Sequence, residues 1–102
     1  MRKFACNRLY VSDTESLSQS VVSVDELGHV SGYAPLKDEQ AATEWIGGVI
    51  VLSGEQDLVP TGDFKILLEH LTHAKLHTYA WHISDFDFFN LQLTDKSIVK
   101  RL

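Results

Sequence analysis

The fold is decided by residues 43–53, which read Thr43-Glu44-Trp45-Ile46-Gly47-Gly48-Val49-Ile50-Val51-Leu52-Ser53. This segment is apolar and β-prone, and it lies in the middle of the sequence. Because its apolar residues run from Trp45 to Leu52 and do not alternate with polar ones, it predicts a strand buried on both faces. The pair Gly47-Gly48 indicates a bulge in this strand, or a place where another backbone comes close.

Three further strands are predicted before the central segment. Residues 3–11 alternate and predict a first strand. Its two faces carry Phe4, Cys6 and Tyr10 on one side and Ala5, Leu9 and Val11 on the other. The Ser-rich residues 12–20 predict a loop. Residues 21–33 predict a hairpin, because Asp25 to Gly28 separates two β-branched runs and Gly28 can supply a positive φ.

An amphipathic helix is predicted after the central segment. The apolar residues that recur at i, i+3, i+4 and i+7 are Phe64, Leu67, Leu68 and Leu71. This spacing predicts a helix at about residues 63–75, with one apolar face turned to the core. Thr61 or Asp63 is the expected N-cap, because a side-chain oxygen there accepts hydrogen bonds from the first free amides.

Strands are predicted again from Leu76 onward, where apolar residues recur at every second position. One face of the first segment carries Tyr79, Trp81 and Ile83. Residues 86–93 predict a second strand, with Phe86 and Phe88 inward, and residues 97–102 predict a last one. We therefore expect a mainly β fold, a small β-sandwich or barrel-like sheet with one helix, and an α+β fold is the alternative.

Composition restricts both the size of the domain and its partners. The chain has 102 residues, 44% of them hydrophobic and 23% charged, which predicts one soluble domain over residues 1–102. A net charge of −5 argues against nucleic acid and anionic membranes as partners. The basic pairs Arg2-Lys3 and Lys100-Arg101 lie at opposite ends of the sequence. No window reaches the roughly 18 apolar residues of a membrane span, so we expect a cytoplasmic protein. The single cysteine, Cys6, is expected to be a small buried residue.

Several segments together resemble the small composite β-sandwich of metal-dependent hydrolases of the amidohydrolase (urease-like) superfamily. Residues 4–11, 21–33 and 43–51 look like the N-terminal half of that domain, and residues 86–102 are similar to its C-terminal half. In that superfamily the β-sandwich flanks a large catalytic (β/α)8 barrel. The resemblance implies a stand-alone β-sandwich, because this chain is too short to hold the barrel.

The metal-binding motif of that superfamily is absent from the corresponding position. There, the strand that matches residues 49–52 continues into a Pro-Gly turn and a His-x-His pair that binds the catalytic metal. Here the following residues are Ser53-Gly54-Glu55-Gln56-Asp57, which contain no histidine. The resemblance therefore carries over no catalytic residue, no cofactor and no hydrolase activity.

Four histidines are the candidate metal ligands. His70, His73 and His77 are spaced i, i+3 and i+7, and His82 follows them. Zinc accepts imidazole nitrogens in tetrahedral sites, so an enzyme that uses His70, His73 and His82 with nearby carboxylates is an alternative function. His77 lies where the apolar period changes to two, which favours separate histidines at the solvent edge or near a helix cap.

Four aromatic residues are the candidate interface, namely Trp81, Tyr79, Phe88 and Phe89. Such residues either fill the core of a small domain or form an exposed patch that marks an interface. We expect a non-catalytic domain that acts by protein–protein interaction or self-association, as a two-fold homodimer. A small-ligand binding module that uses Trp81 and Tyr79 is the second alternative.

Overall fold

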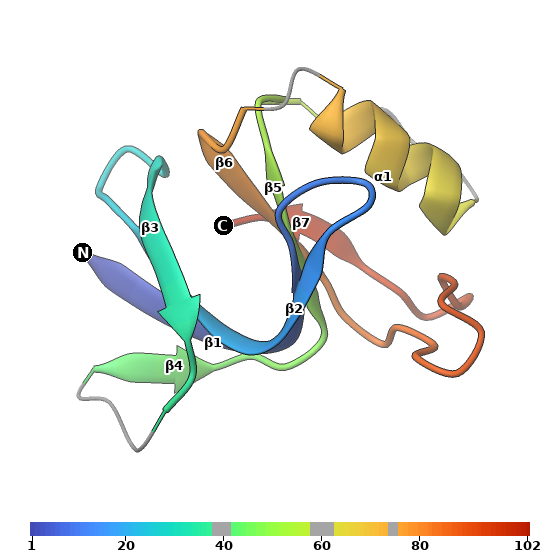
Figure 1. Ribbon diagram of the computed structural model, residues 1–102, viewed down its shortest axis with the longest axis horizontal. Helices are drawn as coiled ribbons and strands as arrows, with labels where there is room; N and C mark the ends of the chain where they lie inside the picture. The colour runs from blue at the N-terminus through green and yellow to red at the C-terminus, as the bar shows by residue number, and fades with distance from the viewer. Residues whose placement is uncertain (38–41, 58–62, 74–75) are drawn as a thin grey trace.

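Seven strands form one mixed sheet in this protein, and a helix packs against one side of it (Figure 1). The computed structural model describes residues 1–37, 42–57, 63–73 and 76–102. Its elements are β1 (Arg2–Tyr10), β2 (Ser16–Val24), β3 (Val30–Pro35), β4 (Thr43–Trp45), β5 (Val49–Ser53), α1 (Phe64–Thr72), β6 (Tyr79–Ile83) and β7 (Val99–Arg101). The prediction of a mainly β fold with one helix is therefore confirmed for the described residues.

The strand order of the sheet is β3-β2-β1-β5-β6-β7, and β4 pairs with the first half of β1. Neighbouring strands are antiparallel, except that β1 runs parallel to both β4 and β5. Across the described residues, all seven strands belong to one continuous mixed sheet. The Val30 amide at the start of the edge strand β3 also donates to the Thr78 carbonyl just before β6, at 2.8 Å, although β3 and β6 are not neighbours in the sheet.

A sharp corner folds this sheet over on itself (Figure 1). At the corner the amides of Asn7 and Arg8 both donate to the Gly48 carbonyl, at 3.1 and 3.3 Å, so β1 contains a bulge. On the neighbouring strand β2, Gln19 lies opposite Asn7 and adopts a φ of 30°. Before the corner β1 pairs with β4, and after it with β5. The sheet therefore has two layers, and β1 and β2 run through both of them.

The bulge changes which side chains of β1 face inward. One core cluster, which we call the inner core, contains Phe4, Cys6, Leu9, Val11, Val22, Val24, Ile50, Leu52 and Ala80. Phe4 and Cys6 come from one layer, and Leu9 and Val11 from the other. The predicted alternation of residues 3–11 is therefore wrong after Cys6, because the bulge shifts the pattern by one residue. Cys6 is fully buried, as expected, and burial raises its thiol pKa to about 11.

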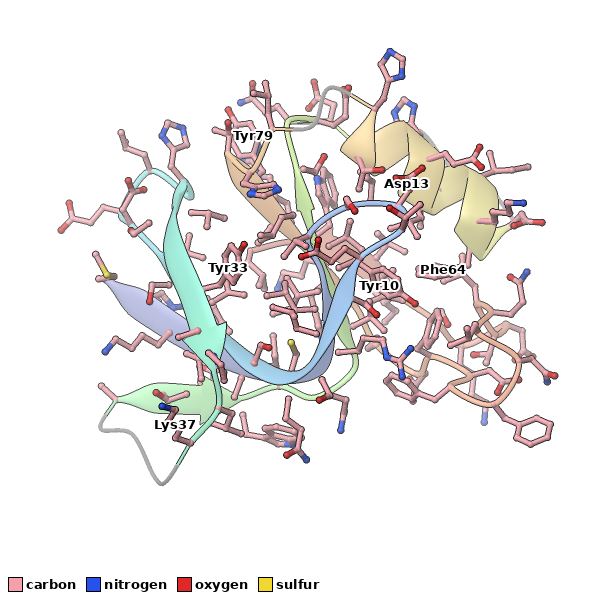
Figure 2. The ribbon with its side chains drawn as sticks, in the orientation of Figure 1. Tyr10, Asp13, Tyr33, Lys37, Phe64 and Tyr79 are labelled. Atoms are coloured by element: carbon pink, nitrogen blue, oxygen red, sulfur yellow. The ribbon has the colours of Figure 1, made fainter. Side chains whose placement is uncertain are left out.

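A second cluster, the outer core, joins α1 to the outer face of β5 and β6. It contains Tyr10, Val49, Val51, Phe64, Leu67, Leu68, Leu71, Trp81, Ile83 and Phe86. The four predicted helix residues are all buried in it. Figure 2 labels Tyr10 and Phe64, whose rings pack edge to face with centroids 5.4 Å apart. The faces predicted for β6 are also confirmed, with Trp81 and Ile83 in the outer core and Ala80 in the inner core.

Helix α1 begins where the sequence predicts and ends earlier. The Asp63 carboxylate accepts from the amides of Lys65 and Ile66, at 2.8 and 3.4 Å, so Asp63 is the N-cap. The helix ends at Thr72, three residues before the predicted limit. Thr61, the other proposed cap, lies outside the described residues, as do residues 74–75.

The central segment, predicted as one strand, is two short strands separated by Ile46, Gly47 and Gly48. The two glycines have φ values of 64° and 63°, which interrupts the ladder. Both alternatives for the glycine pair are correct. The backbone bulges here, and a Cβ on Gly48 would overlap the Ile83 carbonyl oxygen. All five residues of β5 are buried, as predicted for the second half of the segment.

Two further predictions from local pattern are wrong. Residues 16–20 belong to β2 and not to a loop, because their backbone pairs with β1 and starts opposite Tyr10. Residues 86–93 form turns with one isolated bridge between Asp87 and Gln92, and not a strand. The 21–33 hairpin is confirmed, with Gly28 at a φ of 80°.

Candidate functional site

The four histidines proposed as metal ligands do not converge. His77 places Nε2 at 2.8 Å from the Val11 carbonyl oxygen, and His82 places Nε2 at 3.1 Å from that of Gly47. His70 and His73 lie at the end of α1, in a surface hollow that also includes Glu69. Across the described ranges, no three His, Cys, Asp or Glu side chains come together as a metal site. His77 and His82 each engage a backbone carbonyl, which is a structural role.

Trp81 and Tyr79 do not form an open aromatic surface. Trp81 is only 5% exposed, lies in the outer core and donates from Nε1 to the Glu55 carbonyl at 2.9 Å. Tyr79 is half-buried between the ring of His29, at 5.4 Å, and the guanidinium of Arg101, at 5.3 Å. Trp81 is therefore a core residue and not an interface residue. For the same reason, it offers no open face to a small ligand.

Phe88 and Phe89 are exposed, on the segment that joins β6 to β7. We call residues 84–98 the 84–98 loop. Its exposed large apolar side chains are Phe88, Phe89, Leu91 and Ile98, with Phe89 94% and Ile98 63% exposed. Phe86 points inward as predicted, but Phe88 is partly exposed because the segment is not a strand. In Figure 1 this loop lies at the end of the molecule opposite β3 and β4.

The Asp87 carboxylate organises the tip of the 84–98 loop. One oxygen accepts from the amides of Phe89 and Asn90, at 3.0 and 3.1 Å, and the other accepts from the Asn90 side chain at 2.8 Å. The backbones of Asp87 and Gln92 exchange two hydrogen bonds, at 2.9 and 3.1 Å. These bonds close a compact turn, and they hold Phe89 outward.

The loop is also attached to the body of the protein. The ring of Phe86 packs on Phe64 with centroids 4.6 Å apart, and Phe88 packs on Phe86 at 5.2 Å. Gln92 accepts at Oε1 from the Phe64 amide, at 3.2 Å. At the other end of the loop the hydroxyls of Thr94 and Ser97 donate to the Asp85 carbonyl, each at 2.9 Å. Exposed apolar side chains are thus held on an ordered loop.

Acid is expected to weaken the hydrogen bonds that the Asp87 carboxylate makes at the tip of the 84–98 loop. The Asn90 side chain, followed by the Asn90 and Phe89 amides, lowers the pKa of Asp87 below its ordinary value of 3.8. Because the folded pKa is depressed, the tip is stabilised above the unfolded pKa and loses this stabilisation as pH falls through the folded value. A pH titration followed by NMR should show the Phe89 and Asn90 amide signals shifting together, with a midpoint below 3.8.

The matched control for this titration is Asp87→Asn, which removes the titrating group and keeps its size. The shared midpoint should vanish in that variant, while the β5 amides report that the core is still folded. A midpoint at or above the ordinary aspartate value would contradict the role given to Asp87.

A second feature of the structure is a cleft between the two layers of the sheet, lined by residues of β1, β4, β6 and β7. It has a volume of about 180 Å³, and its lining is Arg2, Phe4, Glu44, Ile46, His82, Lys100, Arg101 and Leu102. An adjoining cavity of about 360 Å³ shares Arg2, Phe4, Arg101 and Leu102, and it extends to the β2–β3 turn. The cleft therefore brings Arg2, near the start of the sequence, together with Lys100 and Arg101, near its end.

Sequence reasoning missed this cleft because its walls depend on strand pairing. Arg2 lies on β1 beside β4, and Lys100 pairs with His82 across β6 and β7. Alternation indicates that Arg2 and Phe4 share a face, and that His82 and Ala80 share another. Nothing in the local pattern shows that the corner turns these two faces toward each other.

Comparisons of the chain with protein-family models, with curated proteins and with solved structures found no match. The resemblance to the amidohydrolase composite domain therefore remains a prediction. Helix α1 has nine residues, and the described part of the chain includes no helix with the length and apolarity needed to cross a membrane.

Proposed function

We propose that this protein is a non-catalytic binding domain that self-associates as a two-fold dimer through its 84–98 loop. The observation that supports this proposal is Phe89, a residue 94% exposed on a loop held by its own hydrogen bonds. Single exposed apolar side chains are common on protein surfaces. Four of them on one ordered loop, two of them phenylalanines, are a stronger indication of a contact surface.

The order of the loop favours binding. Association costs free energy when mobile side chains and loops become ordered at an interface. The bonds made by Asp87 and the packing of Phe86 on Phe64 have already ordered this loop in the free protein. Phe88 and Phe89 can then act as rigid aromatic anchors, which are typical of the centre of an interface.

A second copy of the chain is the partner that this loop fits best. In a two-fold interface each residue meets the same surface on the other copy, so the surface must complement itself. Apolar groups satisfy this requirement, whereas like charges do not. The carboxylate of Asp87 is turned to amides of its own loop and is partly compensated by them. The net charge of −5 repels two copies, so added salt should strengthen the dimer by screening that repulsion.

A non-catalytic role is in keeping with the resemblance noted in the sequence. A β-domain of the amidohydrolase type without its barrel has no catalytic metal motif, and its remaining capability is binding. We also propose that the protein is cytoplasmic, and that it binds a protein partner in addition to a second copy of itself.

The substitution Phe89→Asp tests the proposal. It should raise the dissociation constant of the dimer at least about thirtyfold, the effect expected when an aromatic hot spot is lost. Sedimentation velocity across the micromolar range, at low and at moderate salt, gives that constant. The matched control is Leu27→Asp, which adds the same charge at a side chain 75% exposed in the β2–β3 turn.

Three outcomes would contradict the proposal. The first is a wild-type protein that remains monomeric throughout that concentration range at both salt concentrations. The second is an equal loss of dimer in Leu27→Asp and Phe89→Asp, which would indicate charge repulsion without a specific contact. The third is a dimer that Phe89→Asp does not weaken.

A further inference from the structure

We infer that the free edge of β7 binds an extended acidic peptide, which adds to the sheet as an antiparallel strand beside Val99, Lys100 and Arg101. The surface is the edge of β7 and not the exposed side chains of the 84–98 loop, so the inference goes beyond self-association. It rests on the proposed protein partner, for which it names a chemistry. Strand β7 is the last strand in the order β3-β2-β1-β5-β6-β7, so β6 pairs with it on one side.

The backbone groups at this edge follow from the pairing of β7 with β6. The Ile98 carbonyl accepts from the Ser84 amide at 3.0 Å, and the Leu102 amide donates to β6 at 2.9 Å. In an antiparallel strand, the backbone groups of successive residues point to opposite sides, so those of Val99 and Arg101 point away from β6. They meet no further strand among the described residues.

An added strand can reach this edge. Lys100 and Arg101 are exposed, and Val99 is half-buried. The cleft of about 180 Å³ and the adjoining cavity of about 360 Å³ both lie next to β7, because Arg101 and Leu102 line each of them. An edge with unpaired backbone groups is a template on which an extended peptide can form main-chain hydrogen bonds.

The charge around β7 selects an acidic partner. The cations that line the cleft are Arg2, Lys100 and Arg101, against the carboxylate of Glu44. Arg2 approaches Glu44 at 3.7 Å. The Arg101 guanidinium has neutral partners, a backbone carbonyl at 3.2 Å and an aromatic ring at 5.3 Å. Lys100 forms no ion pair with any residue of the described segments. The positive charge of β7 is therefore left for a ligand.

The same cations disfavour a second copy of the chain at this edge. Charged side chains on an edge strand, lysine above all, protect it from pairing with its own kind. A second β7 would bring its own Lys100 and Arg101 close to these cations, and like charges across a strand pair are unfavourable. An acidic strand reverses the sign of this interaction.

The pairing also specifies the peptide. Residues opposite each other in an antiparallel ladder place their side chains on the same face. Lys100 lies opposite His82 on the face of the cleft, and Arg101 lies on the other face. The peptide therefore needs two adjacent acidic residues, one for each face. β-Branched residues suit the positions opposite Val99 and Ile98.

The acidic residues of the peptide belong at this place and not further along. Asp25 and Glu26 are part of the β2–β3 turn, which meets Leu102 just after β7. A carboxylate of the peptide beside that turn would be repelled, whereas one opposite Lys100 or Arg101 is attracted.

The peptide acetyl-Thr-Glu-Glu-Val-Val-Thr-amide has this pattern, and NMR titration with it tests the inference. It should give saturable shifts at the amides of Val99, Lys100 and Arg101. The same peptide with its first valine N-methylated should bind at least about fivefold more weakly, because one backbone donor is lost. A peptide with two lysines in place of the glutamates should bind at least about tenfold more weakly. A single-stranded hexanucleotide, which has the charge but not the strand, should also bind more weakly.

Paired variants identify the residues. Lys100→Glu should weaken binding of the acidic peptide at least about fivefold, because it replaces attraction by repulsion. Lys65→Glu makes the same change at an exposed position of α1 and should leave the affinity unchanged. Phe89→Asp should also leave it unchanged, so peptide binding and the dimer can fail independently of each other.

Four results would overturn the inference. The first is the absence of saturable shifts with the acidic peptide. The second is an N-methylated or lysine-containing peptide that binds as tightly as the acidic one. The third is an equal loss of affinity in Lys100→Glu and Lys65→Glu. The fourth is a hexanucleotide that binds as tightly as the peptide, which would indicate a general site for polyanions.

Discussion

Gly48→Ala is expected to destabilise the protein by more than about 3 kcal/mol, which is a large part of the stability of a domain of this size. Gly48 has a φ of 63°, where a residue with a Cβ is strained by about 1–2 kcal/mol. The added Cβ would also overlap the carbonyl oxygen of Ile83, and it would come within 3.1 Å of the His82 ring. Because the Ile83 carbonyl is backbone in β6, it can move only if the ladder with β5 moves too.

The measurement is urea unfolding followed by circular dichroism, with Gly32→Ala as the control. Gly32 lies in β3, where a Cβ meets no atom within 4 Å, and its φ is not in the positive range. That variant should stay within about 0.5 kcal/mol of the wild type. Gly47→Ala should fall between the two, because its φ is 64° but its closest neighbour is the end of the Asn7 side chain. A Gly48→Ala protein as stable as Gly32→Ala would show that the corner is not built as described.

Phe64→Ala is expected to cost about 3–5 kcal/mol, the range for removing a buried aromatic ring. The ring packs edge to face on Tyr10 at 5.4 Å and on Phe86 at 4.6 Å, so it joins α1, β1 and the 84–98 loop. Its loss should therefore loosen the loop as well as the core. Hydrogen exchange at the paired amides of Asp87 and Gln92 should become faster than exchange in β5 does.

Two further variants keep this experiment interpretable. Phe64→Leu retains most of the volume, and it should fold even if Phe64→Ala does not, with a smaller loss of stability and a smaller change in exchange. Ile66→Ala shortens a side chain on the exposed side of the same helix, and it should change stability little. A loop whose exchange is unchanged in Phe64→Leu and Phe64→Ala alike would show that the aromatic contacts do not order it.

The parts of the fold that the sequence predicts are those that depend on neighbours in the chain. The hairpin follows from Gly28 and its flanking β-branched runs, and α1 follows from its apolar spacing and the cap at Asp63. The corner could not be predicted, because the Gly48 carbonyl accepts from Asn7 and Arg8, about forty positions earlier. The glycine pair indicated a bulge but not which strand would meet it.

The 84–98 loop shows a different kind of error. Its alternating carboxylates and rings match the period of a strand, but Asp87 bonds to amides two and three positions later and closes a turn. Local side-chain bonding thus overrides the pattern. For the candidate sites, the sequence indicated Phe88 and Phe89 but also Trp81, because aromatic type alone does not separate core from surface. The cleft required knowledge of the topology, since Arg2 and Lys100 meet only in three dimensions.

The corner at Asn7 and Gly48 also bears on how the chain reaches its folded state. The two residues bond in both directions, since the Gly48 amide donates to the Asn7 side chain at 2.8 Å and its carbonyl accepts from the Asn7 amide. Neither layer can be completed until the first strand has met the middle of the chain. Contacts between residues so far apart in sequence slow folding, because a long loop must close before they contribute. Because β1 and β2 are common to both layers, we expect the two layers to form and melt as one cooperative unit.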